Sequence, residues 1–110
     1  MGPTDGEIES QGALAQRLAA VGFVLPGSLI VRSVRCGKAN CRCRAEEPQL
    51  HGPYFQWTRT TSTGTPTRHL TAELAERYRS WFDNAAQLRR TVDQLQALSA
   101  SIFERDLSDE

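Results

Sequence analysis

Apolar residues recur at heptad spacing through the last third of the chain. The positions of this register are Leu74, Tyr78, Trp81, Ala85, Leu88, Val92, Leu95, Ser99 and Ile102. Their intervals alternate between four and three residues, and no Pro or Gly interrupts them, which predicts a helix over 71–105 with Thr71 as its N-cap. Such a helix spans roughly 50 Å, more than a small head can cover. Its far half must therefore fold back at Asp83 or Asn84, lie along its own small sheet, or pair with another chain. The unbroken register favours a coiled-coil homodimer through 71–105.

Ahead of this helix the pattern changes to the short alternation that is typical of β-strands. The segments that carry it are SLIVRSV (28–34), PYFQWTRTT (53–61) and PTRHL (66–70). In the second segment Tyr54, Gln56 and Thr58 alternate with Phe55, Trp57 and Arg59, so the two sets face opposite sides of the strand. We expect a small antiparallel sheet that needs a helix or a partner over one face.

The first residues predict another helix, from about Glu7 to about Ala20, because Ile8, Leu14, Leu18 and Val21 recur at roughly helical spacing. The expected organisation is a disordered start (1–6), a head made of this helix and the sheet (7–70), the long helix (71–105) and a short tail (106–110). The predicted fold class is α+β, a small antiparallel sheet with an N-terminal helix and a long C-terminal helix.

All three cysteines and one of the two histidines fall close together, as Cys36-x4-Cys41-x-Cys43-x7-His51. Residues two apart on an extended chain point the same way, so we expect Cys41 and Cys43 to present both sulfurs to one side. Gly37 would allow the backbone turn that a ligand loop requires. Three thiolates and a neutral imidazole make a closed tetrahedral zinc site of the structural kind, which would staple the small head.

Other interpretations of this loop stay open. The cysteines could pack as small apolar residues, with His51 hydrogen-bonded in a turn, or one thiol beside His51 could serve redox or nucleophilic chemistry. His69 fits a surface or capping role and is a reserve fourth ligand. An odd cysteine count fits a reducing cytoplasm better than a secreted disulfide framework, and no stretch is apolar enough for a membrane span or a secretory signal.

The net charge of zero conceals a segregation. Residues 1–31 carry −2, residues 32–70 carry +5, and residues from 71 onward carry −3. A basic block between acidic ends is compatible with nucleic-acid binding as well as with an ordinary solvated surface. The expected phosphate contacts are Arg35, Lys38, Arg42, Arg44, Arg59 and Arg68. Tyr54, Phe55 and Trp57 could stack on bases or could pack against the long helix with Trp81 and Phe82.

The segments LPGSLIVR, CGKANCRC and HGPYFQW, followed by a long helix, resemble a family of small prokaryotic proteins of unknown function. Its shared pattern is LPGSL, CGK-x2-C-x-C and HGPY, and the resemblance covers residues 25–98. The matching positions are Cys36, Gly37, Lys38, Cys41, Cys43, His51, Gly52, Pro53 and Tyr54. Such proteins look like companions of transposases and recombinases, which implies a DNA-related accessory role by association. Glu46 and Glu47 stand where family members often have basic or glycine-rich residues, which argues against phosphate contact there.

These observations favour a cytoplasmic, non-enzymatic accessory protein that binds zinc and nucleic acid, with DNA preferred over RNA, and that dimerises through its long helix. The alternative is an adaptor whose long helix docks a recombinase or transposase while the zinc is purely structural. A thiol-dependent enzyme or redox sensor is a third hypothesis. No catalytic residue is assigned.

Overall fold

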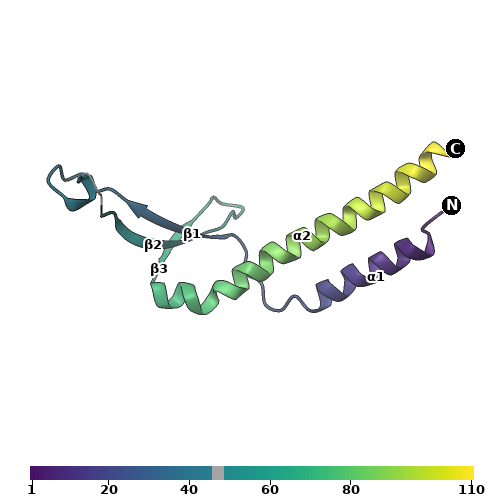
Figure 1. Ribbon diagram of the computed structural model, residues 1–110, viewed down its shortest axis with the longest axis horizontal. Coiled ribbons are helices and arrows are strands. Elements are labelled where there is room, and N and C mark those ends of the chain that lie inside the picture. Colours follow the sequence, from purple (N-terminus) through teal and green to yellow (C-terminus); the bar gives the residue numbers. More distant parts are fainter. Residues whose placement is uncertain (46–48) are drawn as a thin grey trace. The chain divides into compact units, whose positions relative to one another are not determined.

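The computed structural model describes residues 1–45 and 49–110, in two units. One unit is Leu25–Phe82, here the head, and the other joins Met1–Val24 to Asp83–Glu110, here the helical pair. The elements in chain order are α1 (Asp5–Ala19), β1 (Ser28–Val34), a 3-10 helix η1 (Arg42–Arg44), β2 (His51–Thr58), β3 (Thr67–Leu70) and α2 (Ala72–Ser108) (Figure 1). The α+β class with an N-terminal helix and a long C-terminal helix is therefore confirmed. Within the described ranges, none of the helices has an apolar stretch long enough to cross a bilayer.

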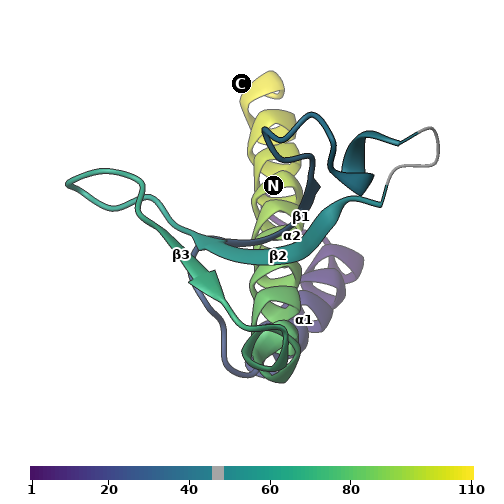
Figure 2. The ribbon, with the colours of Figure 1, turned by 90° about the vertical axis from the view of Figure 1, so that its left-hand side faces the viewer.

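The head is built on a three-stranded antiparallel sheet with β2 between β1 and β3 (Figure 2). Directly paired residues of an antiparallel sheet project from the same side. One side carries the apolar row of Val31, Phe55 and Leu70. The opposite side, here the open face, is formed by Ile30, Arg32, Tyr54, Gln56 and His69. The alternation predicted for Tyr54 to Trp57 is confirmed by this register.

The apolar side of the sheet faces the first turns of α2. Thr71 caps this helix, because its hydroxyl accepts a hydrogen bond from the Leu74 N–H at 3.1 Å. Ala75 is fully buried, and the indole N–H of Trp57 donates to the Pro26 carbonyl at 2.8 Å. An apolar hollow of about 320 Å³ remains in the head, lined by Leu25, Trp57, Leu70, Leu74, Tyr78, Trp81 and Phe82. Trp57 therefore packs with the helix, and of the three aromatic residues of β2 only Tyr54 lies on the open face.

In the helical pair, α1 lies antiparallel to the C-terminal part of α2 (Figure 1). Thr4 caps α1 in a reciprocal capping box with Glu7, so α1 begins at Asp5, within the stretch for which composition predicts disorder. Arg17 donates to Gln94 at 3.3 Å. The expected alternative of a break at Asp83 or Asn84 is wrong, since α2 continues through both residues. Instead, the N-terminal helix covers part of the far half of α2.

Candidate metal centre

The ends of two paired strands bring the four candidate ligands together. β1 ends at Val34, two residues before Cys36, and Val34 pairs with His51, the first residue of β2. The chain between them forms η1, in which Cys43 is fully buried, and Cys41 precedes it as the N-cap. Strand pairing therefore fixes Cys36 and His51 next to each other, and the short helix returns the other two sulfurs to them.

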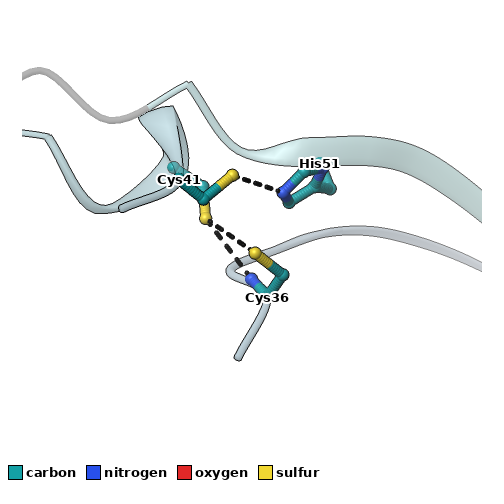
Figure 3. A group of neighbouring side chains, drawn as sticks. Cys36, Cys41 and His51 are labelled. Carbon is teal, nitrogen blue, oxygen red and sulfur yellow. Dashed lines mark hydrogen bonds between the residues drawn. The ribbon is translucent and has the colours of Figure 1, made fainter. Parts of the chain in front are cut away.

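The ligand atoms of Cys36, Cys41, Cys43 and His51 all lie within 4.8 Å of one another. The Cys36 and Cys43 sulfurs are 3.6 Å apart, and the Cys41 sulfur lies 3.1 Å from the imidazole Nε2 of His51 (Figure 3). In a tetrahedral centre with metal–sulfur bonds of about 2.3 Å, two sulfurs are about 3.8 Å apart. The distances and the donor set therefore fit one four-coordinate ion of the kind that prefers sulfur and nitrogen ligands.

The predicted cluster forms, but not by the backbone geometry we expected. Cys41 and Cys43 were expected on an extended chain with both sulfurs on one side. The structure instead begins η1 directly after Cys41, so only Cys41 has extended dihedral angles. Backbone bonds from the Cys41 N–H to Lys38 and from the Arg44 N–H to Cys41 close the turns on either side. The extended-chain argument was wrong because the chain reverses within the ligand spacing.

The glycine that this site requires is Gly52 and not Gly37. Gly52 has a φ of 116°, and a Cβ atom added to it would lie 2.8 Å from the Arg32 carbonyl oxygen. Only glycine adopts such a backbone at low cost. Gly37 has no left-handed φ, and a Cβ added there meets nothing within 4 Å among the described atoms. Gly52, which precedes a cis Pro53, therefore sets the path by which His51 enters the cluster.

Arg44 ties the loop to the end of β1. Its Nε and Nη2 atoms donate to the Cys36 carbonyl oxygen at 3.1 and 2.6 Å. The Cys36 N–H in turn donates to the Cys43 sulfur at 3.3 Å. Hydrogen bonds of this kind orient metal ligands and offset the charge of a thiolate. Arg44 thus holds the cluster together, a role that the charge pattern did not reveal.

The groups around Cys41 favour the thiolate form of its side chain. The pKa of Cys41 is lowered to about 6, first by a hydrogen bond from the Cys43 backbone and then by the neighbouring thiols of Cys36 and Cys43. For Cys36 the largest influence, a backbone hydrogen bond at Lys38, lowers the pKa. Burial and the adjacent thiols outweigh it, so the Cys36 pKa is raised. Metal ions bind thiolates, so of Cys36 and Cys41 it is Cys41 whose surroundings favour the form that binds.

The six cations expected to contact phosphate lie in two places on the head. The segment 35–45, here the metal loop, carries four of them, all exposed: Arg35, Lys38, Arg42 and Arg44. Arg68 of β3 pairs with Trp57 of β2, and the Arg59 guanidinium lies 4.6 Å from the centre of the Trp57 ring. These last two therefore flank the helix-facing side of the sheet. Glu46 and Glu47, which weigh against phosphate contact, lie outside the described residues.

The sequence alone did not single out the open face of the sheet as a candidate site. Arg32 stands opposite Tyr54, and Gln56 stands opposite His69, so four polar side chains from three strands project together. With Val34 they line a hollow of about 230 Å³. None of the three strands contains Asp or Glu. The alternation of side chains along each strand predicts which of them share a face. Only the order of the strands in the sheet places His69 beside Gln56 and away from the cysteines.

Comparison with known proteins gives a family and no activity. Neither the curated proteins nor the solved structures include a match. A family model described as a domain of unknown function, DUF6788, matches residues 5–80, which span α1, the whole sheet, the metal loop and the first turns of α2. The match covers more than half of the chain, so this protein belongs to the DUF6788 family.

Proposed function

We propose that this protein is a non-enzymatic accessory factor in which zinc folds a basic head that binds nucleic acid, with DNA as the preferred ligand. Zinc, when bound, would cross-link the head and supply folding free energy. Three sulfurs and one imidazole would fill its four coordination positions and leave none for a substrate. The residues that would hold it are Cys36, Cys41, Cys43 and His51. The role of the site is therefore structural.

The observation that carries the proposal is that the two folding units carry opposite net charges. The head contains nine Lys and Arg against four Asp and Glu, a net charge of +5. The helical pair carries the compensating −5. A folding unit that concentrates positive charge in this way attracts polyanions, and releasing their counterions drives binding.

The open face supports single-stranded nucleic acid as the form bound. Tyr54 keeps 44% of its surface exposed there and offers an aromatic platform for an unpaired base. Arg32 beside it can pair with a phosphate, while Gln56 and His69 offer hydrogen bonds to a base edge. Three further cations, Arg35, Lys38 and Arg42, follow β1 in the chain, and all three are exposed.

Anisotropy of a short labelled oligonucleotide, single-stranded and duplex, tests the proposal. The logarithm of the affinity should fall linearly with the logarithm of salt concentration, and Arg32→Ala should reduce the slope by about 0.7 to 1. Arg89→Ala in the acidic helical pair is the matched control and should leave the slope unchanged. No binding to either form, or binding that ignores salt, rejects the proposal.

The second candidate is an adaptor that holds a protein partner. The apolar hollow beside Trp57, Tyr78 and Trp81 favours it, because aromatic recesses of this kind anchor partner side chains. A recombinase or transposase as that partner rests on the family resemblance alone. Partner capture that survives Arg32→Ala but is lost in Leu74→Glu would favour the adaptor over nucleic-acid binding.

A further inference from the structure

The helical pair is too thin to bury its own apolar side chains. Of its described residues, only Ala85 and Thr91 are buried, at 6% and 1% exposure. Two helices can cover one stripe on each other and leave the rest to solvent. A four-helix bundle solves this problem by packing the apolar stripes of four helices around a shared core.

One side of the pair is apolar and carries no charge. On α1, a row displaced by about 100° from Glu7, Gln11 and Leu14, which line hollows together with α2, is formed by Ile8, Gly12, Ala15 and Ala19. On α2 the corresponding row is Val92, Gln96, Ser99, Phe103 and Leu107. Each row lies one residue, or about 100°, further along its own helix than the residues at the contact between the helices. Because the two helices are antiparallel, this displacement brings both rows to the same side of the pair. Ile8 and Ser99 indeed line one hollow of about 280 Å³.

The large residues of this side, here the apolar face, are exposed to water. The exposed fractions are 54% for Ile8, 37% for Val92, 65% for Phe103 and 53% for Leu107. The nine positions of the apolar face contain no ionisable side chain, although both helices are otherwise rich in charge. Depletion of charge around exposed aromatic and aliphatic residues is the composition of an interface centre.

The chain exposes more surface than two compact units of its mass would, and the excess is similar to the area that binding one partner buries. The chain exposes 8439 Å². Two separate compact globules, each of half the mass, would together expose only about 7,300 Å². The excess of about 1,100 Å² is comparable to the roughly 800 Å² that each partner buries in a stable protein complex.

We propose that the apolar face binds the same face of a second copy of this chain, so that two helical pairs form a four-helix bundle. A self-complementary face suits a two-fold dimer, because each copy offers the rows that the other lacks. The apolar face shares Val92 and Ser99 with the heptad seam expected from the sequence, but Gln96, Phe103 and Leu107 lie outside that seam. Ile102 of the seam lines a hollow together with Glu7 and Gln11 of α1, so α1 already covers that part of it. The inference does not depend on metal or nucleic-acid binding.

Light scattering coupled to size exclusion tests this on the full chain. The wild-type protein should have twice the 12.2 kDa mass of one chain. Phe103→Glu and, independently on the other helix, Ile8→Glu should each give the single-chain mass while far-UV circular dichroism stays helical. Ala97→Glu places the same charge on an exposed position of α2 about 120° around the axis from Phe103, and it should remain dimeric.

A wild-type protein that is monomeric at about 100 μM overturns the proposal, because an interface of this size gives micromolar or tighter binding. Dimers that persist in both Glu variants at the apolar face also overturn it, since they would use another surface. Dissociation by Ala97→Glu to the same extent would also overturn it, because a charge placed away from the apolar face would then separate the copies equally well. A monomer bound to a different protein or to detergent micelles through this face counts against a second copy as the occupant.

Discussion

Glu7 in the first turn of α1 and Arg105 near the end of α2 form a two-pronged ion pair. The Arg105 Nη1 and Nη2 atoms donate to the two carboxylate oxygens of Glu7 at 2.9 and 3.1 Å. The same guanidinium donates to the Gly2 carbonyl at 2.8 Å, and the Gly2 N–H donates to Asp106 at 2.7 Å. These bonds join the beginning of α1 to the end of α2, and the Glu7–Arg105 pair spans 98 residues of sequence.

This ion pair predicts an acid-sensitive contribution to stability. Arg105 lowers the pKa of Glu7 from 4.5 to about 2, with help from the Thr4 backbone. A carboxyl whose folded pKa is depressed stabilises the fold above its unfolded pKa and loses that effect as pH falls through the folded pKa. The melting temperature of the wild type should therefore fall more than that of Glu7→Gln between pH 5 and pH 2. Parallel curves for the two proteins would contradict this, and any metal released by acid affects both alike.

Periodicity predicted the fold of this chain well, because each element follows a local pattern. Both helices, all three strands and the capping role of Thr71 follow from apolar spacing and turn residues. The partner of the far half of α2 did not follow. The heptad register of α2 is compatible with α1, with a folded-back segment or with a second chain, since all three present an apolar stripe. Only tertiary structure shows that Glu7 and Arg105 join the two helices.

The cluster of three cysteines and one histidine was predictable in its members and unpredictable in its backbone. Composition and spacing select Cys36, Cys41, Cys43 and His51 without geometry, because the chain has only three cysteines and His51 is the nearer of its two histidines. Which glycine is essential depends on φ, and the role of Arg44 depends on where a loop carbonyl points. Neither property leaves a mark in spacing or composition.

Gly52→Ala should weaken the head while Gly37→Ala should not. The new methyl group at residue 52 would lie 2.8 Å from the Arg32 carbonyl and 2.9 Å from the Tyr54 nitrogen, at a φ of 116°. A strained backbone of this kind costs about 1 to 3 kcal/mol. Thermal melts of the metal-loaded proteins measure the difference, and Gly37→Ala should stay within about 0.5 kcal/mol of wild type. Equal losses in both variants would show that the glycines act through the flexibility of the loop.

Loss of one ligand should unfold the head and release zinc. A structural zinc contributes on the order of 10 kcal/mol to the folding of small domains, so Cys41→Ser should lose most of the sheet. His51→Ala should reduce the metal bound per chain, measured by elemental analysis. His69→Ala is its matched control, since His69 lies on the open face, and it should bind as much metal as wild type. An unchanged melting temperature in Cys41→Ser would mean that the cluster holds no structural ion.

Tyr54→Ala separates stacking from charge on the open face. Because the side chain is 44% exposed and no part of the apolar hollow, its removal should leave the melting temperature nearly unchanged. Loss of one stacked base should weaken single-stranded binding by about 1 to 3 kcal/mol. The salt slope should stay at its wild-type value, unlike that of Arg32→Ala, because Tyr54 displaces no counterion. Tyr54→Phe keeps the aromatic ring and should bind like wild type. If Tyr54→Ala also binds like wild type, the bases do not contact this face, and the cations of the metal loop would have to bind the strand without it.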